Sequence, residues 1–125
     1  MTQHYVGTKI VLAYTQQNDK QQEGYGVTYK DGYSSWCPKQ QFEEANIPLG
    51  HIGHYPDWLQ RLIAEAAILD SNRNKLIAAI QANKVPVSEV DILTEQWEAM
   101  THLSVILEAR VQKGKDICNS SNMRD

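Results

Sequence analysis

Apolar residues recur at helical spacing in two long segments, residues 56–83 and 88–113, on either side of a short break at residues 84–87. Asn83 can take the left-handed cap at the end of the first helix, and Pro86 in the break prevents that helix from continuing. The seam of the first segment consists of Leu62, Ala66, Leu69, Leu76 and Ile80, with Arg73 at the one interrupted position. The seam of the second consists of Leu93, Trp97, Met100, Leu107 and Val111. The pattern predicts an antiparallel helical hairpin.

The predicted hairpin carries more apolar surface than two helices can bury against each other. A second stripe on the first helix consists of Leu59, Ile63, Ala67 and Ile77. On the second helix, Leu103, Val105 and Ile106 lie beside the seam. Because a hairpin buries one stripe per helix, the remainder must meet another domain or another copy of the chain. We therefore expect a homo-oligomer, from a dimer up to a hexamer, with any ligand site between subunits.

The first 50 residues have a different pattern. Segments 5–14, 24–30 and 33–36 read as strands, with a polar loop over 15–23 and an Asp31-Gly32 turn. Pro38 suits the start of a short helix over residues 39–45, with Phe42 facing inward. The predicted fold class is α+β: a small N-terminal antiparallel β-meander with a short helix, packed on a long C-terminal antiparallel helical hairpin.

The expected organisation is one compact domain with three parts. These are a β-meander module over residues 1–50, the helical hairpin over 51–118 and a polar, disordered tail over 119–125.

Composition narrows the partners and the compartment. The net charge is −3, and neither half of the chain has an excess of Lys and Arg, so duplex nucleic acid is not an expected partner. No apolar run is long enough to cross a membrane, so no membrane partner is expected either. Two cysteines do not make a disulfide framework, and the N-terminus lacks a signal-peptide pattern. Together these features point to the cytoplasm.

Cationic side chains are the first candidates for a binding site. Arg61 and Arg110 fall at the open end of the predicted hairpin, and Lys113 follows one turn later. Two guanidinium groups there could clamp a phosphate. The alternative is local ion pairing, of Arg61 with Glu65 and of Arg110 with Glu108 or with a neighbouring chain.

Aromatic side chains are the second group of candidates. Folding the hairpin at residue 85 sets Arg73 beside Trp97, where the two could hold a purine ring between them. The alternative is a guanidinium that lies over the indole while its head reaches water. Tyr33 and Trp36 on the meander could stack on bases. Their alternative role is core packing between sheet and helices.

Motifs for catalysis and for metal binding are missing from the sequence. It has no nucleophile elbow, phosphate-binding glycine loop, HExxH motif or catalytic carboxylate pair. His51, His54 and Cys37 lack a convincing further ligand, and zinc requires three or four in fixed geometry. We therefore expect a protein that is not an enzyme and needs no metal or cofactor.

Several short runs resemble a family of small bacteriophage proteins. On the first helix these are residues 60–65 (QRLIAE), Leu69-Asp70 and Lys75-Leu76. On the second they include Gln96, Glu98, Met100 and the run Ser104-x-Ile106-Leu107-x-x-Arg110. Near the N-terminus they include residues 5–9 (YVGTK) and 31–36 (DGYSSW). With these runs the chain resembles the phage Thoeris anti-defence sponge family.

The resemblance implies a function that the residues alone do not give. Members of that family sequester cyclic ADP-ribose signals made by host TIR-domain immune enzymes, without degrading them, and some also bind cyclic oligonucleotides. The resemblance implies an oligomeric sponge in the host cytoplasm, with pockets at subunit interfaces and with Arg110 as the first ligand residue to carry over. One alternative is a phage protein that binds and inhibits a host protein through its exposed helix face. Another is a hydrolase of the same messenger.

Overall fold

The computed structural model describes residues 2–123. The chain divides into two compact units, one ending at Pro48 and the other beginning at Leu49. This division falls two residues before the expected boundary at residue 50. The expectation that both units form one compact domain stays a prediction, and each unit is therefore described by itself.

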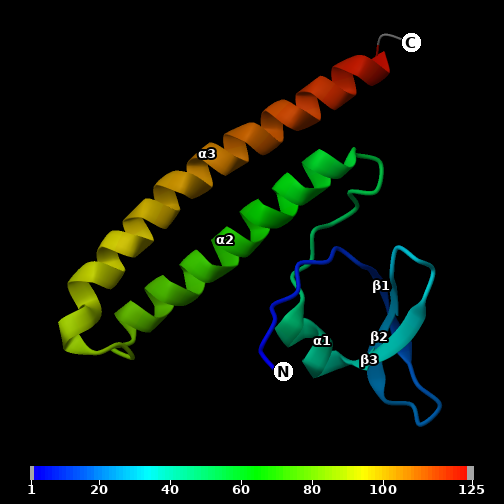
Figure 1. The fold of residues 1–125 in the computed structure, drawn as a ribbon, viewed down its shortest axis with the longest axis horizontal. Coiled ribbons are helices and arrows are strands. Elements are labelled where there is room, and N and C mark those ends of the chain that lie inside the picture. The colour runs from blue at the N-terminus through cyan, green and yellow to red at the C-terminus, as the bar shows by residue number, and fades with distance from the viewer. Residues whose placement is uncertain (1, 124–125) are drawn as a thin grey trace. The chain divides into compact units, whose positions relative to one another are not determined.

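The N-terminal unit is the expected three-stranded antiparallel meander with a short helix (Figure 1). Its strands are β1 (Leu12–Gln17), β2 (Glu23–Thr28) and β3 (Ser34–Pro38), in the order β1-β2-β3. Helix α1 (Lys39–Ala45) has the predicted bounds. The Asp31-Gly32 turn is confirmed: the backbone N–H of Tyr33 donates to Asp31 Oδ1 over 3.0 Å, and Gly32 has a φ of +90°.

The first strand lies further along the chain than the sequence predicted. We expected residues 5–14 to be a strand, but β1 begins at Leu12 and continues through the polar residues to Gln17. The register explains the shift, because β1 pairs with β2 from Leu12↔Thr28 to Gln17↔Glu23 and β2 ends at Thr28. Residues before Leu12 therefore have no partner strand, and Tyr5 and Val6 are 86% and 90% exposed.

Two glycines let aromatic rings cross the central strand. A side chain at Gly24 would collide with the indole ring of Trp36, and one at Gly26 would lie 2.5 Å from the ring of Tyr14. Trp36 is held there by its Nε1–H, which donates to the carbonyl oxygen of Gln16 over 2.9 Å. Glycine is thus required at these positions by close approach rather than by backbone angles.

Tyr25 and Phe42 hold α1 against the sheet. Phe42 points inward, as expected, and stacks on Tyr25 with ring centroids 4.3 Å apart. The Tyr25 hydroxyl also donates to Glu43 Oε2 over 2.7 Å. This hydrogen bond to the carboxylate favours the neutral phenol and raises the pKa of Tyr25.

Gly24→Ala is expected to destabilise the N-terminal unit by about 1–3 kcal/mol, because the added methyl group must displace the Trp36 ring and the backbone of Cys37. Gly7→Ala is the matched control, since a Cβ at Gly7 meets no atom within 4 Å. Thermal melts followed by tryptophan fluorescence measure both variants. Equal melts for the two would mean that Trp36 moves aside without cost.

The C-terminal unit is the predicted antiparallel hairpin. Helix α2 (Asp57–Gln81) and helix α3 (Val90–Met123) lie side by side, joined through the single turn η1 (Val87–Glu89) (Figure 1). Asn83 ends α2 in the left-handed conformation, with a φ of +57°, as its place before the break predicted. These observations confirm the fold class at the level of its elements.

Helix α3 is longer than the sequence predicted. We expected it to end at Lys113, but it continues to Met123 and extends past the start of α2. Part of the expected disordered tail, residues 119–123, therefore lies within the helix, and residues 124–125 lie outside the described residues. The reason is local: no proline follows residue 113, and Gly114 is buried against α2 instead of ending the helix.

The core of the hairpin lies toward its open end. Leu59, Leu62 and Leu107 are buried, and Ala66 packs against them. Ser104 is buried too. Leu59 corrects one prediction: we placed it on the surplus apolar stripe, but it is 0% exposed, because Gly114 leaves room for it between the helices.

Candidate functional site

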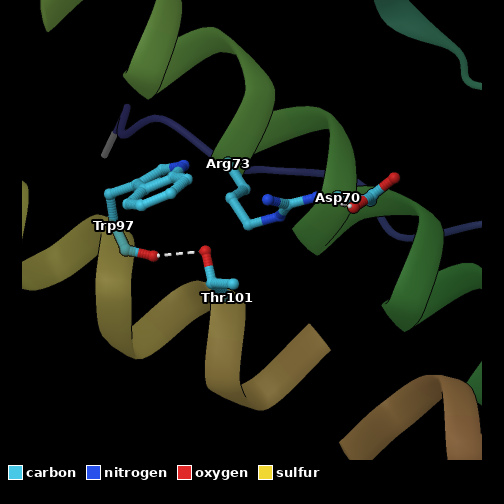
Figure 2. A network of polar contacts seen from close by, with 4 residues as sticks. All are labelled: Asp70, Arg73, Trp97 and Thr101. Atoms are coloured by element: carbon cyan, nitrogen blue, oxygen red, sulfur yellow. Dashed lines mark hydrogen bonds and ion pairs between the residues drawn. The ribbon is translucent and has the colours of Figure 1, made fainter. Parts of the chain in front are cut away.

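The packing of α2 on α3 fixes which candidate residues share a level of the hairpin. At one end, Gly114 lies against Leu59. Further along, Arg73 and Trp97 lie side by side between the helices, as predicted (Figure 2). Counting between these two fixed points puts Arg61 level with residues 111–112, within one helical turn of Arg110.

Arg73 and Trp97 are packed together rather than held apart. The guanidinium group of Arg73 points along α2 and donates from Nη2 to Asp70 Oδ1 over 2.9 Å (Figure 2). Arg73 Nε and Trp97 Nε1 are buried and lack a hydrogen-bond partner in the described part of the chain. This arrangement is close to the alternative in which the arginine packs beside the indole. Among the described residues, the two side chains leave no open slot for a purine between them.

The three cations at the open end are available for a partner. Arg61, Arg110 and Lys113 are all exposed. Within residues 2–120, where side chains are described, none of them makes an ion pair or a hydrogen bond to another side chain. The local pairs that we weighed, Arg61 with Glu65 and Arg110 with Glu108, are thus not formed in this structure. Lys115 is engaged differently, with Nζ 5.9 Å from the centroid of the Tyr55 ring.

An open depression of about 300 Å³ lies between α2 and α3 at this level. Its apolar floor and its two polar side chains are contributed by Ile63, Ala66, Glu108, Val111 and Gln112. Glu108 and Gln112 were not predicted as lining residues, because both are polar and occupy exposed positions of a helix.

The arginines do not line this depression. Arg110 is two positions from both Glu108 and Gln112, and two positions turn an α-helix by about 200°. Arg61 is likewise two positions before Ile63 on α2. The carboxylate of Glu108 also repels phosphate. A single hairpin therefore offers an apolar hollow with an acidic edge on one side and exposed guanidinium groups on the other.

The remaining candidates, Tyr33 and Trp36, belong to the N-terminal unit. Tyr33 is 64% exposed and stacks on Tyr29, with ring centroids 5.9 Å apart, so its outer face is free. Trp36 is half-buried over Gly24, and its indole N–H is occupied. Trp36 therefore packs within the sheet itself.

The described residues were compared with the requirements of a metal site and of a membrane-spanning helix, and they meet neither. Among the residues the structure describes, no group of three or more His, Cys, Asp and Glu side chains is placed to hold a metal ion. In the same part of the chain, no helix is both long enough and apolar enough to cross a membrane.

Comparison with known families gives one match, and it falls on the hairpin. Residues 56–113 match the model of the Sequestin family. The helical hairpin is thus similar to the Sequestin family. The matched segment runs from the first residue before α2 to Lys113 and includes Arg61, Arg73, Trp97 and Arg110. This agrees with the resemblance found in the sequence and supports a sequestering role.

The match leaves the rest of the chain without a relative. The N-terminal unit and the last turns of α3 lie outside the Sequestin segment. No curated protein and no solved structure matches the chain. The ligand of the hairpin is therefore inferred from the side chains that the hairpin exposes.

Proposed function

We propose that this protein is a phage anti-defence sponge that binds a cyclic nucleotide immune messenger and holds it without cleaving it. The messenger class that we propose is the cyclic ADP-ribose isomers of Thoeris signalling, with cyclic oligonucleotides as further ligands. The single observation that carries the proposal is the Sequestin match, which covers the hairpin and its exposed cations.

The chemistry of the exposed residues suits such a ligand. Cyclic ADP-ribose carries a pyrophosphate and an adenine ring. Arg110, Arg61 and Lys113 supply unpaired cations for phosphate oxygens. Because the depression in a single hairpin has an acidic edge, we place the anionic part of the ligand on the arginine side, between copies of the chain.

A thermal-shift panel tests the proposal. Purified protein is melted with each of several cyclic ADP-ribose isomers, cyclic dinucleotides and cyclic trinucleotides, with linear ADP-ribose and AMP as controls. A ligand present at about 100 times its Kd stabilises the folded state by about 2.7 kcal/mol. A raised Tm with a cyclic messenger and not with AMP is expected. No shift with any cyclic nucleotide at millimolar concentration would contradict the proposal.

A second measurement separates a sponge from a hydrolase. The complex is denatured by heat and the released nucleotide is analysed by mass spectrometry. We expect the messenger to return intact in stoichiometric amount. A linear or dephosphorylated product that increases with incubation time would show catalysis instead.

One observation favours a second candidate function, the inhibition of a host protein. Several apolar side chains on α3 are exposed, among them Leu103, Val105 and Ile106 at 43%, 63% and 43%. Exposed apolar side chains such as Leu103 and Ile106, which are three positions apart and lie on one face of the helix, are typical of a protein-binding surface. This candidate predicts that the protein inhibits its host target whether or not free messenger is present. A reconstituted immune assay with messenger added in excess distinguishes the two functions, because excess messenger saturates a sponge but does not relieve inhibition of a host protein.

Trp97→Leu is expected to reduce messenger binding by about 5-fold to 100-fold if the indole stacks on the adenine, since stacking contributes roughly 1–3 kcal/mol per base. Leucine keeps an apolar side chain between the helices and removes an unsatisfied buried donor. Tryptophan fluorescence during a messenger titration measures the effect, with Trp58→Leu as the control for a half-exposed indole elsewhere on the hairpin. An unaltered affinity would make Trp97 ordinary core and direct the search for the aromatic partner to Tyr33 or Trp36.

A further inference from the structure

The β-sheet of the N-terminal unit has two faces, and α1 covers one of them. Side chains alternate between the two faces along a strand. The ring of Tyr25 on β2 stacks on Phe42 of α1, so Tyr25 points to the covered face. Gly24 and Gly26, the neighbours of Tyr25 in β2, therefore lie on the opposite face, which we call the open face. The open face is outside the Sequestin segment, so the proposed messenger binding gives it no role.

Two aromatic rings cross the central strand on the open face. Tyr14 of β1 and Trp36 of β3 are both paired with Gly26, from opposite edges of the sheet. The Tyr14 ring lies above Gly26, and the Trp36 ring lies above Gly24. The Trp36 indole is fixed there, because its Nε1–H donates to the carbonyl oxygen of Gln16. The two glycines thus let two rings lie next to each other against the backbone of β2.

The two rings belong to an apolar strip that is open to solvent. Leu12 and Tyr14 are 72% and 52% exposed, Trp36 is half-buried and Pro38 is exposed. Pro38 ends the strip on the far edge strand, level with the residue four positions after Leu12. With about 3.4 Å per residue and about 4.8 Å between strands, the strip is about 17 Å long. This length fits about five or six residues in the polyproline II conformation, which rises about 3.1 Å per residue.

The open face carries no charge on its strands, and this narrows the class of partner. None of the residues that β1, β2 and β3 direct to it is acidic or basic. Its polar side chains are neutral, and two of them, Thr28 and Ser34, share a hydrogen bond of 3.2 Å. Sites that stack the bases of single-stranded nucleic acids combine aromatic rings with cations for the phosphates. An uncharged partner therefore fits the open face better than one that carries phosphate.

We propose that the open face binds a proline-rich, uncharged segment of another protein in the polyproline II conformation. Proline rings pack against aromatic side chains, and such a segment leaves its backbone carbonyl groups unpaired. The hydroxyl groups of Tyr14, Thr28 and Ser34 are donors for those carbonyl groups. The segment belongs to a different protein, because the prolines of this chain, at positions 38, 48, 56 and 86, are isolated from one another. Binding requires no nucleotide, so it goes beyond the proposed messenger sponge.

Nuclear magnetic resonance of the isotope-labelled full chain tests the proposal, with capped decaproline as the probe. A decapeptide of glycine and serine controls for peptide length, and AMP tests for base stacking. We expect decaproline at millimolar concentration to shift the resonances of β1, β2 and β3 and of the Trp36 indole N–H in a saturable way. The absence of such shifts with decaproline would overturn the proposal. Shifts of these resonances with AMP and not with decaproline would assign the open face to nucleotide stacking instead.

Two variants locate the binding site, and a third is the matched control. Tyr14→Thr removes the ring but keeps a residue that favours strands, and it is expected to weaken decaproline binding about 10-fold or more. Leu12→Thr is expected to weaken binding about 3-fold, through lost apolar contact. Because Leu12 is 72% exposed, this variant tests the site even where Tyr14→Thr does not fold.

The control is Tyr5→Thr. Tyr5 is 86% exposed and precedes β1, so this variant removes a tyrosine ring that is off the sheet and is expected to bind decaproline like the wild type. Equal weakening by Leu12→Thr and Tyr5→Thr would refute the assignment to the open face. Wild-type affinity in a folded Tyr14→Thr variant would refute it as well.

Discussion

Leu59→Ala is expected to lower the free energy of unfolding of the hairpin by about 2–5 kcal/mol, which is the usual cost of deleting a buried leucine side chain. Leu59 is 0% exposed and belongs to a core of only three buried leucines, with Leu62 and Leu107. It also fills the space that Gly114 leaves on α3, where a Cβ would lie 2.8 Å from the Leu59 Cδ1. The cavity would therefore open between rigid helices that cannot easily collapse into it.

Urea denaturation followed by far-ultraviolet circular dichroism measures this change, at one fixed protein concentration because association would stabilise the folded state. Val87→Ala is the control in the same unit, since Val87 is 91% exposed and its truncation is expected to change stability by less than about 0.5 kcal/mol. If Leu59→Ala unfolds at the same urea concentration as Val87→Ala, the core is not where the structure places it.

Arg110→Ala is expected to weaken binding of the cyclic messenger by about 30-fold to several thousand-fold, because removing one partner of a desolvated charge contact costs about 2–5 kcal/mol. Folding is expected to be nearly unaffected. Arg110 is exposed, lies well before the end of α3 at Met123, and is replaced by the residue with the highest helix propensity.

Isothermal titration with the messenger, thermal melts and light scattering on the same preparation separate these effects. Lys75→Ala on α2 removes an exposed cation elsewhere on the hairpin and is expected to bind like the wild type. Unchanged affinity in Arg110→Ala would assign Arg110 to the surface alone. Lost affinity together with lost mass would instead assign it to assembly.

The architecture could be predicted from the sequence where the signals were local and repeated. The bounds of α1, the Asp31-Gly32 turn, the Asn83 cap and the juxtaposition of Arg73 and Trp97 all follow from spacing and turn chemistry. The start of β1 could not be predicted in this way. It depends on where β2 ends at Thr28, a property of the partner strand and not of residues 5–11.

On the hairpin, the burial of individual side chains was harder to predict than the presence of the two helices. Leu59 appeared to belong to a surplus stripe because nothing in its own helix shows that α3 presents a glycine opposite it. The continuation of α3 beyond Lys113 was not predicted for the same reason. A glycine can end a helix or allow close contact with another helix, and only the opposite helix shows that Gly114 does the latter. The candidate cations were placed at the correct level of the hairpin, but the depression beside them turned out to face Glu108.

Four exposed apolar residues of α3, Ile92, Leu103, Ile106 and Ile117, each lie one position before a residue that is buried or half-buried. A rotation of α3 by about 100° would present these four residues to α2 in place of Leu93, Ser104, Leu107 and Cys118. That misfolded pairing would bury Arg110 and Lys113 beside Leu59 and Leu62, and burying unpaired charges is strongly unfavourable. Arg110 and Lys113 therefore select the correct face for α2 before any partner or ligand is present. A neutral substitution at both positions is expected to weaken this discrimination, although a side chain at position 113 would still meet Leu59 where Gly114 leaves room.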